Sequence, residues 1–175
     1  MQKVAVFGKP GSGKSTLSKA LASASDLPLY PLDSIIYKPN GELVAREEFD
    51  TIHTDILNSD SWIIDGFGPI SAFYQRLDAA DTLIYIDLPY WMSYWFVTKR
   101  LLKGIIVKPE GWPEGSSAFN GTMQSYKTLK LCPKFWNQDF LDKLLKYSER
   151  KEVLIITTLS KLNQFISLQT TKSRK

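Results

Sequence analysis

The feature that most constrains this fold is a glycine-rich segment between two stretches of contrasting periodicity. Residues 4–7 form a short apolar run rich in β-forming residues, and beyond the segment Leu17, Ala20 and Leu21 recur at helical spacing. The pattern therefore predicts a strand, a tight loop and a helix in immediate succession. The segment itself reads Gly8-Lys9-Pro10-Gly11-Ser12-Gly13-Lys14-Ser15.

These eight residues match the spacing G-x-x-x-x-G-K-[ST] of a phosphate-binding loop, or P-loop. Its glycines permit positive φ, so backbone N–H groups can turn toward phosphate oxygens at the positive end of the following helix. We expect Lys14 to reach the β- and γ-phosphates and Ser15 to coordinate Mg²⁺, which makes ATP and Mg²⁺ the expected cofactors. The residues expected to bind nucleotide in this segment are Gly8, Pro10, Gly11, Ser12, Gly13, Lys14, Ser15 and Thr16.

Length and composition place the chain among small globular proteins. Its 175 residues fit one domain, and no run approaches the ~20 apolar residues of a membrane span. We therefore expect no membrane partner. The single cysteine, Cys132, is expected to be a partly buried small side chain and cannot form an internal disulfide. Because no apolar signal-peptide core opens the chain either, a cytoplasmic protein is expected.

Further elements follow from local periodicity. Strands are expected at residues 27–32, 62–64, 82–86 and 153–156, and helices at residues 46–57, 91–103, 139–147 and 159–168. Strands that alternate with helices imply βαβ crossovers, and hence a three-layer α/β fold with a mainly parallel sheet and helices on both faces.

Two segments depart from this alternation. Residues 104–133 carry four glycines and three prolines without a sustained period, so we expect a long loop or an insertion with small helices that could act as a lid. Residues 169–175 are expected to form a flexible basic tail.

Three of the expected strands end in an acid, at Asp33, Asp65 and Asp87. In a parallel sheet these ends share an edge with the P-loop. We expect Asp65 to hold Mg²⁺ or its water, with a turn-forming Asp-Gly as the alternative. Asp33 is placed to orient or deprotonate an acceptor hydroxyl, although an Asx turn or a helix cap is equally open. Asp87 is expected to cap the next helix.

A basic cluster occupies the helix expected after the fourth strand. Lys99, Arg100 and Lys103 fall within one turn of each other just before the Gly- and Pro-containing segment. This arrangement is typical of a lid stem that brings positive charge to ATP, and a solvated charged face is the alternative. Trp91 and Trp95 on the same helix are expected to pack, and the only histidine, His53, is expected to be structural.

Together, these residues resemble the adenylate kinase-like P-loop kinases, and more closely the bacterial "DNA topology modulation" subgroup. The resemblance extends from residue 4 to about residue 147, through residues 8–15, 32–33, 62–66, 81–82 and 86–89. It implies a five-stranded parallel sheet, ATP on the first loop, a lid after the fourth strand and the Mg²⁺-side role for Asp65. Lys99 and Arg100 match the lid cations of the family.

The chain departs from that family around the acceptor. Adenylate kinases follow the Asp-Gly-Phe matched at residues 65–67 with Pro-Arg, whose arginine grips the acceptor's phosphate, whereas Gly68 and Pro69 stand here. Arg76 on the next helix is the expected substitute. Phe96 occupies a position where related kinases tend to carry an arginine near the adenine. Acceptor contacts are accordingly expected from Asp33, Asp65, Gly66 and Arg76.

The function expected from these features is transfer of the γ-phosphoryl group of ATP to a small molecule such as a nucleoside, a nucleotide or another hydroxyl compound. Lys14, Asp33 and Arg100 are the expected catalytic residues. The alternative is a nucleotide-dependent regulatory NTPase associated with DNA topology, which the basic tail and the pI near 9.0 favour. We find no helix-turn-helix, zinc finger or dense basic stripe, so nucleic acid is not an expected main partner. The absence of an Asn-Lys-x-Asp segment argues against a GTPase.

Overall fold

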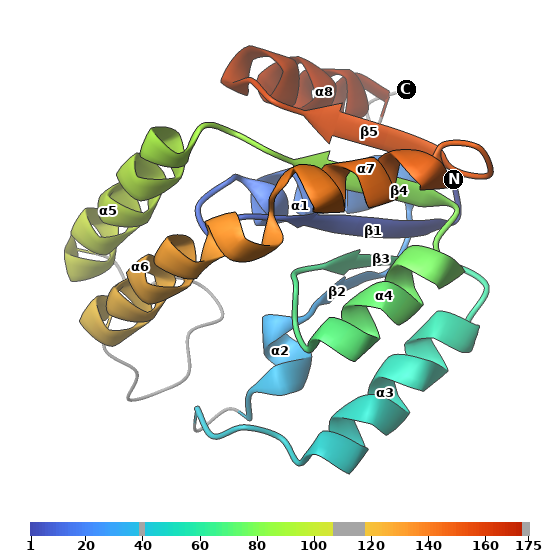
Figure 1. Ribbon diagram of the computed structural model, residues 1–175, viewed down its shortest axis with the longest axis horizontal. Helices are drawn as coiled ribbons and strands as arrows, with labels where there is room; N and C mark the ends of the chain where they lie inside the picture. The colour runs from blue at the N-terminus through green and yellow to red at the C-terminus, as the bar shows by residue number, and fades with distance from the viewer. Residues whose placement is uncertain (39–40, 107–117, 173–175) are drawn as a thin grey trace.

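In the computed structural model, which describes residues 1–38, 41–106 and 118–172, a five-stranded sheet is enclosed by helices on both faces (Figure 1). The strands are β1 (Lys3–Gly8), β2 (Leu29–Pro31), β3 (Trp62–Asp65), β4 (Thr82–Ile86) and β5 (Glu152–Ile156). The helices are α1 (Lys14–Ser25), α2 (Asp33–Ile36), α3 (Arg46–Asn58), α4 (Ile70–Ala79), α5 (Tyr90–Ile106), α6 (Ala118–Phe135), α7 (Gln138–Tyr147) and α8 (Leu159–Lys172).

The sheet has the strand order β2-β3-β1-β4-β5, and every neighbouring pair is parallel. This confirms the predicted α/β class and the five parallel strands. In the register, Gly8 at the end of β1 lies opposite Ile86 at the end of β4, and Pro31 lies opposite Asp65. The loops that leave β1, β2, β3 and β4 therefore meet at one edge of the sheet, where ligands of such folds bind.

Alternation along the central strand divides the core into two layers. Val4 and Val6 pack into the cluster beneath α1 and α8, whereas Ala5 and Phe7 pack into the aromatic cluster beneath α4 and α7. Phe7 stacks at 5.6 Å from the ring of Tyr85 on the neighbouring strand. The interior strands β1, β3 and β4 are buried throughout or nearly so, because helices cover both faces.

The segment at residues 104–133 differs from its expected form. Helix α5 continues to Ile106, and residues 118–133 belong to α6, while residues 107–117 lie outside the described part. Leu129 and Cys132 of α6 pack against Val97 of α5, and Tyr94 stacks on Tyr126 at 5.8 Å. We call this pair of packed helices the α5–α6 hairpin. It lies beyond the sheet edge that carries the P-loop (Figure 1).

Two smaller expectations were also wrong. Helix α8 runs to Lys172, so residues 169–172 are helical, and residues 173–175 lie outside the described part. Trp91 and Trp95 do not pack, because 69% and 57% of their surfaces are exposed on α5. His53, in contrast, is buried and stacks on Phe49 at 5.5 Å, which confirms its structural role. Among the described residues, no helix is both long and apolar enough to cross a membrane.

Candidate active site

The backbone of the P-loop, residues 8–15, adopts the conformation that its glycines permit. Gly8, Gly11 and Gly13 have φ values of 147°, 70° and 89°. Gly13 is the N-cap of α1 and offers no side chain to satisfy the first-turn amides, and that turn contains no acidic residue. These amides and the positive end of the helix are therefore open to an anion.

Close packing fixes the position of this loop. A Cβ atom on Gly11 would lie 2.6 Å from the carbonyl oxygen of Ser93 and 2.9 Å from Cγ2 of Val97, both on α5. A Cβ atom on Gly8 would collide with the carbonyl oxygen of Ile86 at the end of β4. The P-loop is thus wedged against β4 and the base of the α5–α6 hairpin, and only glycine fits at these two contacts.

Lys14 occupies the centre of a charged group. Its Nζ atom donates a hydrogen bond to the carbonyl oxygen of Lys9 at 2.8 Å. Burial lowers the pKa of Lys14, the carboxylates of Asp65 and Asp33 raise it, and Arg100 lowers it further. The fold therefore brings into one electrostatic neighbourhood four residues that the sequence separates by up to 86 positions (14 to 100).

Asp65 and Ser15 form the part of the site that would suit Mg²⁺. Asp65 ends β3 and is 6% exposed. Burial raises its pKa, which Lys14 and a hydrogen bond from Ser15 lower. Its Oδ1 atom is buried without a hydrogen-bond partner in the described part of the chain. A carboxylate oxygen and a hydroxyl are suitable ligands for Mg²⁺, which commonly takes few protein ligands and keeps water or phosphate oxygens for the rest.

Asp33 on α2 and Arg100 on α5 interact electrostatically. Asp33 is exposed at the first position of α2, whose N-cap is Leu32 without a side-chain cap, so the helix-cap alternative for Asp33 does not hold. On α5, Arg100 donates to Oγ of Ser125 on α6 at 2.8 Å. Burial lowers the pKa of Arg100, and Asp33 raises it. Lys99 is exposed beside it on α5.

Arg76, the expected acceptor contact, lies inside the protein beside the loop that follows β3. It is 1% exposed, and its Nη2 atom donates to the carbonyl oxygens of Phe67 at 2.5 Å and Gly66 at 3.3 Å. Burial lowers its pKa to about 10, against the opposing effect of Asp65. Its Nη1 atom is buried without a hydrogen-bond partner among the described residues, so the loop after β3 pairs only part of the guanidinium. The expected acceptor contact of Arg76 stays a prediction.

The remaining predicted residues are placed as follows. Pro10 is half-buried, Thr16 is exposed, and the hydroxyl of Ser12 is buried without a hydrogen-bond partner in the described residues. Asp87 was expected to cap the helix after β4. The first hydrogen bonds of α5 instead run from the amides of Met92 and Ser93 to the carbonyl oxygen of Pro89, two residues beyond Asp87. The Asp87 carboxylate forms an ion pair with Lys9 instead.

Lys9 is the residue that sequence reasoning missed. It occupies one of the variable positions of the P-loop motif, where the pattern specifies no side chain. The available signal was the combination of this lysine with an acid at the end of a later strand. That signal becomes useful only once β4 is known to lie beside β1.

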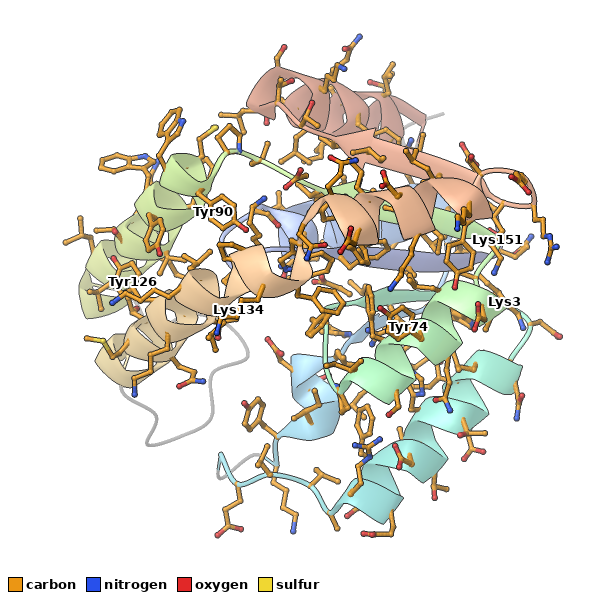
Figure 2. The ribbon with its side chains drawn as sticks, viewed as in Figure 1. Lys3, Tyr74, Tyr90, Tyr126, Lys134 and Lys151 are labelled. Atoms are coloured by element: carbon orange, nitrogen blue, oxygen red, sulfur yellow. The ribbon has the colours of Figure 1, made fainter. Side chains whose placement is uncertain are left out.

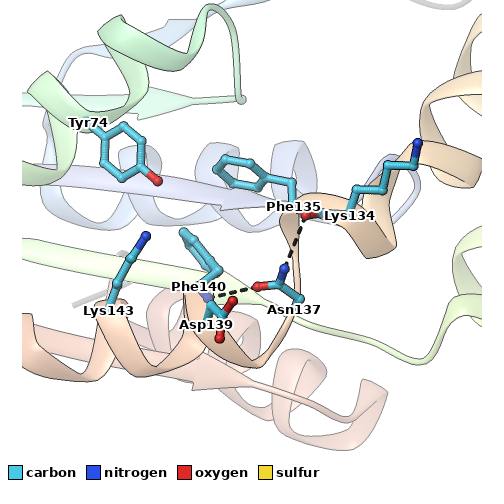
Figure 3. A pocket seen from close by; sticks show the side chains of 7 residues that line it. All are labelled: Tyr74, Lys134, Phe135, Asn137, Asp139, Phe140 and Lys143. Carbon is cyan, nitrogen blue, oxygen red and sulfur yellow. Dashed lines mark hydrogen bonds between the residues drawn. The ribbon is translucent and has the colours of Figure 1, made fainter.

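A separate pocket of about 170 Å³ is lined by residues of α4, the end of α6 and α7 (Figure 3). Phe135 and Phe140 face it, and Lys143 extends toward Tyr74 (Figure 3). Asn137 at its rim caps α7 by accepting from the amide of Phe140 at 3.0 Å. None of the predicted site residues lines this pocket, whose lining is Tyr74, Lys134, Phe135, Asn137, Asp139, Phe140 and Lys143.

Comparison with protein-family models and with curated protein sequences found no significant match. Solved structures do match. A shikimate kinase from Acinetobacter baumannii in complex with shikimate aligns with a TM-score of 0.52 at 19% identity, over 100% of this chain and 95% of the other. The chain has a P-loop kinase-like α/β fold.

Two further solved structures align with the chain. A shikimate kinase from Bacteroides thetaiotaomicron aligns with a TM-score of 0.50 at 13% identity, over 98% of each chain. A sugar kinase from Janibacter sp. HTCC2649 aligns with a TM-score of 0.46 at 15% identity, over 98% of this chain and 93% of the other. At these identities the likeness concerns the fold alone, and the DNA topology modulation subgroup stays a prediction.

Proposed function

We propose that this protein is an ATP- and Mg²⁺-dependent phosphotransferase that passes the γ-phosphoryl group to a hydroxyl of a small molecule. The observation that carries the proposal is the convergence of Lys14, Asp65 and Asp33 at the sheet edge next to the uncapped first turn of α1. Phosphoryl transfer requires mainly positioning and neutralisation of charge, and this set of groups supplies both.

On the nucleotide side, the P-loop amides and the N-terminus of α1 would hold the phosphates. Lys14 would exchange its hydrogen bond to the Lys9 carbonyl for phosphate oxygens and stabilise their charge in the transition state. Ser15 and Asp65 would hold Mg²⁺, whose contribution is to neutralise the β- and γ-phosphate oxygens. We propose Lys99 and Arg100 as the cations of the α5–α6 hairpin that face the nucleotide.

On the acceptor side, Asp33 is the proposed base. Its exposed carboxylate can accept the proton of an acceptor hydroxyl as the new oxygen–phosphorus bond forms and the bond to the leaving diphosphate oxygen breaks. Arg100, which interacts electrostatically with Asp33, would stabilise the negative charge of the phosphoryl group during transfer. Asp65 and Gly66 are proposed to line the acceptor site, and the internal position of Arg76 favours an acceptor without a phosphate of its own.

The test begins with binding. Titration calorimetry with Mg²⁺ and ATP should detect binding at or below millimolar concentration, and the absence of binding there would lead us to abandon the proposal. Transfer from labelled ATP is then screened across nucleosides, nucleotides, sugars and small hydroxy acids. Shikimate belongs in this panel because it is the bound molecule of a structural neighbour. Binding of ATP without transfer to any acceptor, together with salt-dependent binding to duplex DNA, would favour the regulatory alternative.

A further inference from the structure

The second residue of the P-loop is a fully buried lysine. Lys9 is 1% exposed, although its side chain carries an ammonium group. A buried charge is costly unless it is paired. The partners of Lys9 are the carboxylate of Asp87, with which it forms an ion pair, and the ring of Tyr90, whose centroid lies 4.5 Å from Nζ.

These contacts join three elements that meet at the sheet edge. Lys9 belongs to the P-loop, Asp87 follows the end of β4, and Tyr90 is the first residue of α5. The amide of Asp87 also donates to the carbonyl oxygen of Ile156 at 2.8 Å, which ties this point to the end of β5. The ammonium group of Lys9 is therefore anchored to the rigid sheet and to the base of the α5–α6 hairpin.

The main chain of the same residue organises the rest of the loop. The carbonyl oxygen of Lys9 accepts from the amide of Ser12 at 3.2 Å and from Nζ of Lys14 at 2.8 Å. The side chain of Lys9 thus anchors the peptide unit on which the turn of the loop and the orientation of Lys14 both depend.

We propose that the ion pair of Lys9 with Asp87 positions the P-loop for the triphosphate, with Lys9 acting as a positioning residue. This inference rests on the proposed function. Asp87 and Tyr90 already contact the ammonium group of Lys9, so this group does not bind phosphate itself. Lys9 acts by holding its own peptide unit in place, and Lys14 remains the residue that binds phosphate directly. Loss of the pair should therefore weaken nucleotide binding more than does a substitution elsewhere that lowers the Tm by the same amount.

The first test measures the affinity for ATP with Mg²⁺ by calorimetry in folded variants. Lys9→Met keeps the length of the side chain and removes its charge, and we expect the Kd to rise about tenfold. Lys9→Arg should restore most of the affinity, because a guanidinium can pair with Asp87 and stack on Tyr90. A folded Lys9→Met variant that binds as tightly as the unmodified protein would overturn the inference.

Lys151 offers a matched control. It is a half-buried lysine whose Nζ donates to the carbonyl oxygen of Leu77 at 2.6 Å and lies 5.3 Å from the ring centroid of Tyr147. It lies at the opposite end of the molecule from Tyr90 (Figure 2). Lys151→Met should lower the Tm and leave the Kd unchanged. If both lysine variants weakened binding equally, Lys9 would be merely structural.

The second test needs no nucleotide. Hydrogen exchange at the amides of Ser12 and Leu17, which donate to Lys9 and Gly13, should be faster in Lys9→Met and unchanged in Lys151→Met. Unchanged exchange in Lys9→Met would overturn the inference whatever the protein binds. If the protein does not bind ATP but exchange is faster in Lys9→Met, the proposed function is refuted, whereas the role of Lys9 in holding the loop is supported.

If Lys9→Met does not fold, a substitution of its partner Asp87 tests the same ion pair. Asp87→Asn removes the other half of the pair, and because the Asp87 side chain is 36% exposed, the change is less disruptive there than at buried Lys9. Asp87→Asn should show the same rise in Kd and the same faster exchange. The variant Lys9→Met/Asp87→Asn should lose less affinity than the two single variants lose in sum, because both substitutions break the Lys9–Asp87 pair, although Asp87→Asn also alters the hydrogen bond between Tyr85 and Asp87. Additive losses in the double variant would contradict the inference.

Discussion

The ammonium nitrogen of Lys14 lies 2.8 Å from the carbonyl oxygen of Lys9, inside the loop that both residues help to form. This hydrogen bond connects the proposed catalytic cation to the peptide that the Lys9–Asp87 pair anchors. Phosphate oxygens would compete with that carbonyl for the same ammonium protons. The peptide unit of Lys9 therefore connects the proposed nucleotide-binding residue Lys14 to the Lys9–Asp87 ion pair.

Removing Lys14 should separate catalysis from folding. We expect Lys14→Ala to reduce kcat/KM by at least about a hundredfold, because it deletes a cation that acts in the transition state. Stability should change little, since burial already disfavours the charged form. Phosphoryl transfer and thermal unfolding are measured in parallel with Lys19→Ala, an exposed lysine on the same helix. Full activity in Lys14→Ala would contradict the assigned role.

Asp65 should determine the Mg²⁺ requirement. In Asp65→Asn, the Mg²⁺ concentration for half-maximal activity should rise about tenfold or more, because a neutral amide is a poorer ligand than a carboxylate. Asp60→Asn, at an exposed acid just before the same strand, is the matched control and should show no change. Titration of activity with MgCl₂ distinguishes the two variants. An unchanged Mg²⁺ requirement in Asp65→Asn would remove Asp65 from the metal site.

Gly11 should tolerate no side chain. Gly11→Ala places a Cβ atom 2.6 Å from the carbonyl oxygen of Ser93 at a φ of 70°, so the loop or α5 must move. We expect a loss of about 1–3 kcal/mol in the free energy of unfolding and weaker ATP binding. Gly121→Ala inside α6 should have the opposite sign and stabilise by roughly 0.5–1 kcal/mol. Urea denaturation and calorimetry measure both quantities, and equal effects of the two substitutions would refute this reasoning.

His53 should make the protein sensitive to mild acid. Burial lowers its pKa to about 4 from an ordinary value of 6.5, with Arg76 adding to the effect. The unfolded chain therefore binds a proton that the folded chain does not between these two pH values, and stability falls as the pH falls from 6.5 toward 4. The loss attributable to this group is up to about 3 kcal/mol. In urea denaturation across this pH range, His53→Gln should show a flatter profile, and parallel profiles would contradict the prediction.

Arg76 should support the acceptor loop without contacting nucleotide. Arg76→Met removes the donors to the carbonyls of Gly66 and Phe67 and should destabilise the fold by about 2–4 kcal/mol. In protein that remains folded, the acceptor KM should rise while the Kd for ATP stays constant. The acceptor KM is measured once the screen has identified an acceptor. A rise confined to the Kd for ATP would place Arg76 elsewhere in the mechanism.

Local patterns were sufficient for the parts of the fold that local chemistry determines. The strand at Thr82–Ile86 was predicted with its observed bounds, because a continuous apolar run ends at an acid. Helix α3 was predicted to within one residue at its end, since Phe49 and Ile56 recur at helical spacing behind two first-turn glutamates. Helix α6 was missed, because Gly121 and Pro133 obscured the spacing of Tyr126, Leu129 and Cys132, whose burial depends on α5.

The sequence by itself determined the P-loop, the alternation of strands and helices, and the acids at Asp33, shortly after β2, and Asp65, at the end of β3. Each of these follows from residue types within a few positions of one another, so no distant contact is needed to recognise it. Only the tertiary structure decided how Arg76 and Lys9 are used. A buried cation must find its partners wherever the fold places them, and for Lys9 that partner is Asp87, 78 positions along the chain.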